Sequence, residues 1–178
     1  MTGAVSDPVV QCALHAGFAL LFASAARHKW RDLRGFRRAL DDYALLPARS
    51  VPAAATGLAA LETGIALGLL VPGAGALPAL AGAGLLLVYA AAIALNLWRG
   101  RGHIDCGCGA SDVTIGPGLV VRNAGLSVLL ALAARPAEPR ALAGLDALHF
   151  AAALAVAVLL YGASEQLLSF SRTWRNPA

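Results

Sequence analysis

Two cysteines separated by one residue are the strongest chemical signal in this sequence. Cys106 and Cys108 lie in the stretch H-I-D-C-G-C-G that begins at His103, and a glycine follows each cysteine. Glycine permits the tight backbone that brings neighbouring cysteines within bonding range. A disulfide in so small a ring is expected to be strained, and strain makes a disulfide easier to reduce. The spacing therefore favours a redox pair that exchanges electrons with another protein.

Two other interpretations of the cysteine pair stay open. Cys106 and Cys108 together with His103 offer three ligands to a metal ion, although their spacing differs from that of standard zinc sites. The two thiols could also be structural or inert. Cys12, by contrast, lies alone in an apolar segment, where a cysteine is usually a small packing residue.

Three arginines could support thiol chemistry at this pair. Arg99 and Arg101 precede the cysteines closely, and Arg122 follows at the start of the next apolar segment. Positive charge stabilises the thiolate, which is the nucleophilic form of cysteine. We therefore regard these three side chains as candidate thiolate stabilisers.

Glu62 lies near the middle of an apolar segment, where a charged side chain is costly. Insertion scales give roughly 2.5–3.5 kcal/mol for a charged residue at the centre of a membrane helix. We therefore expect Glu62 to face the interior of a helix bundle, with Arg122, Asn123 or Asn96 as its partner. Its role is either to handle protons beneath the cysteine pair or to make a structural polar contact.

Five continuous apolar segments must position these residues. The chain is 58% hydrophobic and only 13% charged, whereas soluble domains carry about 25% charged residues. A membrane-crossing helix needs about 20 apolar residues, and the apolar runs lack the alternation of a β-barrel. The predicted helical segments cover residues 8–26, 51–71, 76–98, 119–134 and 145–168.

The expected fold is therefore all-α. We predict an integral membrane bundle of four to five transmembrane helices, forming a single transmembrane domain over residues 1–178 of a multi-pass protein. Between the first two segments, Leu33, Phe36, Leu40 and Tyr43 share one helical face. This pattern predicts an amphipathic helix in the membrane interface, with a solvated connector helix as the alternative.

The basic residues are concentrated beside the first apolar segment. Seven of the fourteen Lys and Arg residues fall between Arg27 and Arg49, which indicates contact with anionic lipid. No nucleic-acid motif accompanies them, so we expect no nucleic-acid partner. The positive-inside rule places this connector, and the cysteine loop on the same side, in the cytoplasm. A periplasmic disulfide role would need the opposite side, and the sequence leaves both open.

The motifs around the cysteine pair resemble the MauE family of methylamine-utilisation membrane proteins, which is related to the DoxX-like group. The resemblance covers about residues 10–135, and a further C-terminal helix at about 145–168 lies beyond it. The sequence differs from the family pattern after the cysteines, because Gly109-Ala110 stands where the family often has phenylalanine and glycine. The matching stretches are Asn96-Leu97-Trp98-Arg99-Gly100, the cysteine pair, Arg122-Asn123, Arg34-Gly35-Phe36, Tyr43-Ala44-Leu45-Leu46-Pro47 and Leu61-Glu62.

This resemblance implies an accessory role in the maturation of methylamine dehydrogenase, whose small subunit is rich in disulfides. Cys106 and Cys108 would then belong to a thiol–disulfide oxidoreductase system in the bacterial inner (plasma) membrane. The implied partners are a thioredoxin-like protein and the disulfide-rich client enzyme. Analogy with the vitamin K epoxide reductase bundle raises a membrane quinone as cofactor, although no motif identifies a quinone site. The alternative function is a non-enzymatic membrane helper or small-molecule transporter.

Overall fold

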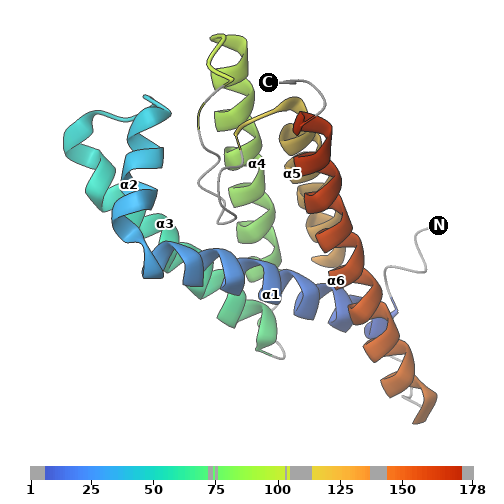
Figure 1. Ribbon diagram of the computed structural model, residues 1–178. Helices are drawn as coiled ribbons and strands as arrows, with labels where there is room; N and C mark the ends of the chain where they lie inside the picture. Colours follow the sequence, from blue (N-terminus) through green and yellow to red (C-terminus); the bar gives the residue numbers. More distant parts are fainter. Residues whose placement is uncertain are drawn as a thin grey trace.

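The computed structural model describes residues 7–71, 74, 76–102, 104, 114–136 and 144–173, and within α6 it describes the side chains of residues 144–156, 158, 159, 161 and 162. All five predicted apolar segments form helices (Figure 1). The amphipathic connector predicted between the first two segments is also a helix, which confirms the all-α bundle. The helices are α1 (Pro8–Arg31), α2 (Leu33–Asp42), α3 (Val51–Leu70), α4 (Leu77–Trp98), α5 (Pro117–Ala133) and α6 (Gly144–Thr173), with a 3₁₀ turn at Ala48–Ser50.

Aspartates set the boundaries of the first two helices. The Asp7 side chain accepts a 2.8 Å hydrogen bond from the Val9 N–H, and Pro8 occupies the first turn of α1, where its missing N–H costs nothing. Asp32 ends α1, and its carboxylate accepts a 2.8 Å hydrogen bond from the Gly35 N–H at the start of α2. One residue thus makes the corner between the two helices.

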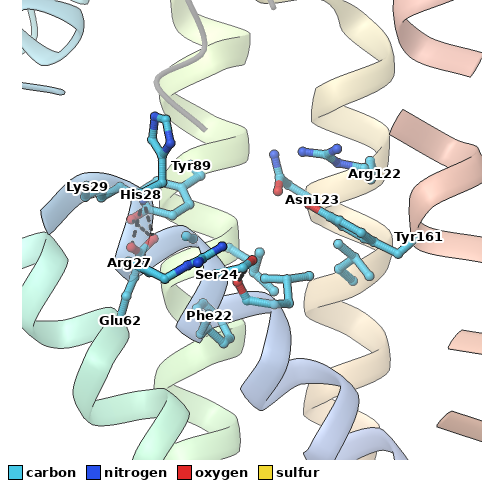
Figure 2. Close-up of a pocket in the computed structure, with 14 residues that line it drawn as sticks. Phe22, Ser24, Arg27, His28, Lys29, Glu62, Tyr89, Arg122, Asn123 and Tyr161 are labelled. Carbon is cyan, nitrogen blue, oxygen red and sulfur yellow. Dashed lines mark hydrogen bonds and ion pairs between the residues drawn. The ribbon is translucent and has the colours of Figure 1, made fainter. Parts of the chain in front are cut away.

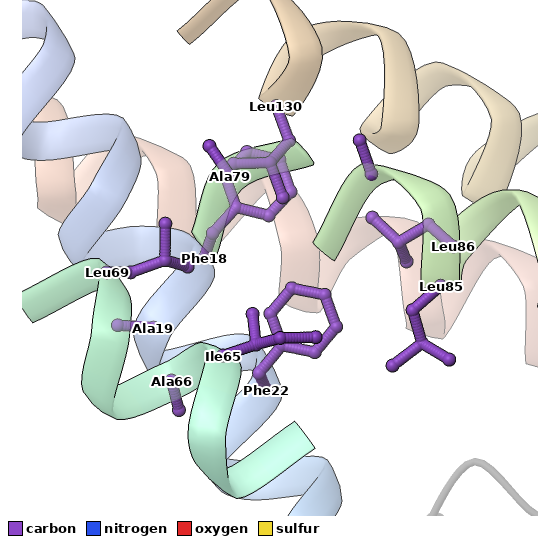
Figure 3. Packing of buried hydrophobic residues seen from close by; sticks show 11 residues of the cluster. Phe18, Ala19, Phe22, Ile65, Ala66, Leu69, Ala79, Leu85, Leu86 and Leu130 are labelled. Atoms are coloured by element: carbon purple, nitrogen blue, oxygen red, sulfur yellow. The ribbon is translucent and has the colours of Figure 1, made fainter. Parts of the chain in front are cut away.

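The interior of the bundle forms where α1, α3, α4 and α5 meet (Figure 3). Gly82 of α4 lies at this junction, and a Cβ built there would lie 2.7 Å from Leu130 and 2.9 Å from Phe22. Small residues let membrane helices approach closely. The buried cluster comprises Phe18, Ala19, Phe22, Ile65, Ala66, Leu69, Ala79, Ala83, Leu85, Leu86 and Leu130.

The outer surface of the bundle is apolar. Leu67 of α3, Leu87 of α4 and Val121 of α5 are 62%, 53% and 72% exposed. A soluble monomer rarely leaves large contiguous apolar patches uncovered, whereas lipid accepts them. By length and composition α1, α3 with its preceding turn, and α4 can each cross a membrane, and α5 and the first part of α6 are shorter apolar helices. The chain is an α-helical membrane protein.

Contacts between helix ends show which loops share an end of the bundle. Near the start of α1, Gln11 and His15 contact the Ala133 carbonyl oxygen at the end of α5, at 2.9 and 3.1 Å. At the other end, Tyr43 after α2 packs with Ile93 of α4 and with residues between α4 and α5. We call this second end the connector end. The connector and the segment between α4 and α5 therefore share one end of the bundle, as the sequence predicts.

Candidate functional site

A buried ion pair joins α1 to α3 inside the bundle. The Lys29 Nζ donates hydrogen bonds of 2.7 and 2.8 Å to the two oxygens of Glu62, and the Tyr89 hydroxyl of α4 donates a third, of 2.8 Å. The Lys29 and Glu62 side chains are 4% and 1% exposed. The ring of Phe36 lies 5.0 Å from the same nitrogen, measured to the ring centroid. Four helices, α1 to α4, therefore meet at this one cluster. Figure 2 shows Lys29, Glu62 and Tyr89 of this cluster.

These contacts correct the predicted partners of Glu62. The carboxylate does face the bundle interior, as expected, but it is bound by Lys29 and Tyr89 instead of Arg122, Asn123 or Asn96. The Asn96 and Asn123 side-chain amides instead donate to carbonyl oxygens one turn earlier in their own helices, at 3.1 and 2.9 Å. The carboxylate is held by three hydrogen bonds from the bundle, and a role of Glu62 in proton handling stays a prediction.

α1 also extends beyond its predicted end. The apolar segment was expected to stop at Ala26, yet the helix continues to Arg31. Phe18, Phe22, Ala26 and Lys29 are all buried and recur at spacings of four, four and three residues. Lys29 therefore continues the inward face of α1.

The segment that contains both cysteines begins and ends on the bundle. The Ile115 N–H donates a 2.9 Å hydrogen bond to the Ile104 carbonyl oxygen. Both side chains are buried against Tyr43 and Ile93, together with Leu119 at the start of α5. Ile104 and Ile115, which lie on either side of both cysteines, are thus fixed to each other and to the connector end.

Tyr43 is the aromatic centre of this apolar contact. Its side chain is 7% exposed, and burial raises the pKa of the phenol to about 12. The residue after it, Ala44, has a φ of 47°, which turns the chain away from α2. Tyr43 lies in one of the stretches that resemble the MauE family, although no local sequence pattern places it beside Ile104 and Ile115.

A glycine motif ends α4 just before the cysteine-bearing segment. Gly100 has a φ of 74°, the left-handed conformation that costs L-residues about 1–2 kcal/mol. The Arg101 N–H donates to the Asn96 carbonyl oxygen at 2.9 Å, and the Gly100 N–H donates to that of Leu97 at 3.0 Å. This pair of bonds is a Schellman motif. It explains why a glycine stands at position 100.

The three predicted thiolate stabilisers lie on different parts of the chain. Arg99 caps α4 and is exposed, and Arg101 follows it at the connector end. Arg122 lies instead in the second turn of α5, with its guanidinium 5.6 Å from the ring centroid of Tyr161 in α6. A role in stabilising a thiolate stays a prediction for all three.

The predicted redox pair itself lies outside the described residues. This applies to Cys106 and Cys108 and to His103, the third ligand in the metal alternative, so both interpretations stay predictions. Cys12 is described, and its side chain is exposed on α1. Cys12, expected to be a small packing residue, therefore does not pack in the bundle interior.

Two hollows flank the Lys29–Glu62 pair. One, the basic cleft, has a volume of about 260 Å³ and lies between α1, α4, α5 and α6, with Arg27, His28 and Arg122 among its lining residues (Figure 2). The other, the apolar groove, has a volume of about 550 Å³ and lies between α2, α3 and α4, with Tyr43 and Ile93 in its wall. The groove falls within the usual size range of small-molecule sites.

Together these features define a class: a small α-helical membrane protein with an ion pair inside its bundle and a cysteine-bearing segment whose flanking residues, Ile104 and Ile115, are held at one end. A family model described as "Methylamine utilisation protein MauE" matches residues 8–136, and the chain belongs to this family. The match contains the buried ion pair, the cysteine segment and α5.

Curated relatives agree with this assignment. A methylamine utilization protein MauE from Methylophilus methylotrophus is 36% identical over 97% of this chain and 93% of its own length. One from Methylorubrum extorquens is 38% identical over 90% and 88%. One from Paracoccus denitrificans is 41% identical over 57% and 55%. No solved structure matches the chain.

Proposed function

We propose that this chain is a multi-pass protein of the plasma membrane that serves methylamine utilisation as a thiol–disulfide redox accessory. The observation that carries the proposal is the anchored cysteine segment. The Ile115–Ile104 hydrogen bond and the contacts with Tyr43 and Ile93 fix both of its flanks to the connector end. Methylamine utilisation is the role named in the family and in the relatives.

The proposed chemistry is two successive thiol–disulfide exchanges. A client thiolate attacks the Cys106–Cys108 disulfide and forms a mixed disulfide, which releases the other sulfur as a thiolate. The second client thiol gives up its proton and attacks the mixed disulfide, so the client is oxidised and this chain holds the dithiol. The disulfide of a thioredoxin-like partner then takes the two electrons and two protons and restores the starting state.

Mixed-disulfide capture tests this proposal. Cys106→Ser and Cys108→Ser are each prepared in a Cys12→Ser background and mixed with a thioredoxin-like partner that lacks its resolving cysteine. The remaining cysteine of this partner is held as a mixed disulfide with glutathione, so attack by the single thiolate of this chain releases glutathione as a thiolate. We expect at least one single variant to form a covalent adduct that a reducing agent releases, because the remaining thiolate has no intramolecular partner. The Cys12→Ser, Cys106→Ser, Cys108→Ser triple variant is the matched control. Normal maturation of the client enzyme in cells carrying the triple variant would end the proposal.

The apolar groove favours a second candidate function. Its lining is almost wholly apolar, with Leu40, Leu58 and Val88 among the contributing side chains, and it would suit a small apolar molecule in a helper or transporter protein. Thiol reactivity separates the two functions. If Cys106 and Cys108 can both be alkylated without loss of client maturation while Leu58→Trp abolishes it, the helper function is supported.

A further inference from the structure

The apolar groove between α2, α3 and α4 has no role in the thiol exchanges proposed above, and it reaches from the surface of the bundle to its interior. The exposed side chains of Leu46 and Val88 line it, and so does the buried Lys29. In Figure 1, α2 and α3 lie on one side of this space and α4 on the other. The groove therefore opens toward the surrounding lipid and ends beside the Lys29–Glu62 pair.

Gly57 shows that the α3 wall of the groove is unfilled. It lines the groove, and a Cβ built there meets nothing within 4 Å. A cavity with apolar walls stays dry and accepts apolar molecules. The groove volume of about 550 Å³ falls within the range of about 300–1,000 Å³ for ligand pockets. We therefore expect the groove to hold an apolar chain instead of water.

The location of the groove favours a lipid as the source of that chain. Tyr43 and Ile93 lie in its wall and also in the apolar contact at the connector end. Another part of the wall comes from α2, through Phe36, Ala39 and Leu40. An amphipathic helix of this kind lies at the boundary between headgroups and acyl chains. A phospholipid whose acyl chain enters the groove would thus have its headgroup beside α2.

The charge beside the groove matches an anionic headgroup. Residues 27–50 hold seven Lys and Arg residues and three aspartates. One of the seven, Lys29, is paired with Glu62, which leaves six positive charges against three negative ones. Arg34 and Arg38 are exposed on α2, the helix whose apolar face lines the groove. Anionic headgroups attract basic segments of this kind at the ends of membrane helices.

Arg37 adds a second observation that is independent of the charge count. It follows Leu33 by four residues and precedes Leu40 by three, so it borders the apolar face of α2. Its Nε is buried and has no hydrogen-bond acceptor among the residues that the structure describes. An unpaired buried donor is costly, and a phosphate oxygen would satisfy it, because phosphate is a strong acceptor for guanidinium donors.

We propose that the apolar groove binds one anionic phospholipid, with an acyl chain between α2, α3 and α4 and the phosphate against the arginines of α2. Acyl chains are about as apolar as leucine side chains, so the tail fits the groove without distinguishing one lipid from another. The arginines supply the preference for negative charge. The site is separate from the cysteine pair, and a bound phospholipid differs from the small molecule that a helper or transporter function would need.

Native mass spectrometry of the full chain tests this site. The chain is placed in nanodiscs with equal parts of phosphatidylglycerol and phosphatidylcholine of different mass, and is then released in a mild detergent. We expect one phosphatidylglycerol to stay bound per chain. Equal retention of the two lipids, retention of neither, or a bound molecule of any other mass would overturn the proposal.

Two matched glycine substitutions on α3 locate the lipid. Gly57→Phe fills the groove, and we expect the fraction of chains that carry phosphatidylglycerol to fall about tenfold. Gly64→Phe is the control, because Gly64 lies two turns further along α3, also meets nothing within 4 Å and does not line the groove. Equal retention in both variants would contradict binding in the groove.

Arginine substitutions test the headgroup without filling the groove. One Lys or Arg near an anionic surface contributes about 1 kcal/mol, so Arg37→Gln should lower the preference for phosphatidylglycerol about fivefold. Arg135→Gln should leave it unchanged, because Arg135 is exposed beyond α5 at the opposite end of the bundle. An unchanged preference in Arg37→Gln, or loss of the lipid when Cys106 and Cys108 are both replaced by serine, would contradict the assignment.

Discussion

At the scale of single residues, the Lys29–Glu62 pair is the contact whose removal should lower the free energy of unfolding most. Lys29→Met leaves a buried carboxylate without its cation, and breaking a buried pair from one side costs about 3–5 kcal/mol. Lys29→Met combined with Glu62→Leu should recover much of that loss, because an apolar pair of similar volume carries no desolvation cost. The free energy of unfolding is measured by SDS titration in mixed micelles.

The matched control for this pair is Arg31→Met, which removes an exposed positive charge two residues further along α1. If Arg31→Met destabilised the chain as much as Lys29→Met does, the ion pair would not be the source of the effect.

Tyr43 gives a pH dependence with a definite sign. Burial raises the phenol pKa in the folded state to about 12 from an ordinary value of 10.0, so the folded state favours the protonated form. The contribution of Tyr43 to the free energy of unfolding is complete below about pH 10 and is lost as the pH rises through 12. Between pH 10 and pH 12 we therefore expect the Tyr43→Phe variant to lose less stability than the parent does. Thermal unfolding in buffered micelles measures this loss. An identical loss in both proteins would contradict this.

The position of Glu62 could be predicted from the sequence, whereas its partner could not. Glu62 was predictable as an inward-facing group because an ionisable residue in an apolar helix must avoid lipid. Its partner was missed because Lys29 stands in a run of basic residues and was counted with the surface cluster. The available signal was helical spacing, since Lys29 follows Phe22 and Ala26 on the buried face of α1.

At the scale of elements, Gly82 sets how closely α4 approaches α1 and α5. We expect Gly82→Leu to destabilise the bundle by about 1–3 kcal/mol, because extra atoms in a packed core force shifts in neighbouring side chains. Gly84→Leu is the control, since a Cβ at Gly84 meets nothing within 4 Å. Both variants are compared by SDS titration, and equal stability of the two would argue against close packing at Gly82.

Helix existence was predictable at this scale, whereas contacts between helices were not. Long apolar runs bounded by Gly and Pro identify helices 51–70 and 77–98 almost to the residue, because lipid leaves the backbone no other way to pair its polar groups. The contact of Tyr43 with Ile104 and Ile115 joins residues more than sixty positions apart. No local pattern encodes such a contact, since any apolar residues of suitable size would satisfy it.

At the scale of the whole molecule, α4 should separate its two ends across the membrane. The turn before α4, at Ala74, and the cysteine segment after it lie at opposite ends of this helix. We expect a single cysteine at Ala74→Cys, and Cys106 alone in an otherwise cysteine-free chain, to react with a membrane-impermeant maleimide from opposite faces of intact cells and inverted vesicles. Labelling of both from one face would show that α4 does not cross. The face that labels Cys106 identifies the compartment of the client.

The proposed redox function requires that the sulfurs of Cys106 and Cys108 can be reversibly oxidised and reduced. The full chain carrying Cys12→Ser is equilibrated in glutathione buffers of defined potential, quenched with acid, tagged with a maleimide and weighed by mass spectrometry. The prediction is a change from two tags to none in a single two-electron step, with a midpoint between about −270 and −120 mV, as in thiol–disulfide exchange proteins. Two tags at every potential, showing Cys106 and Cys108 always reduced, would contradict it.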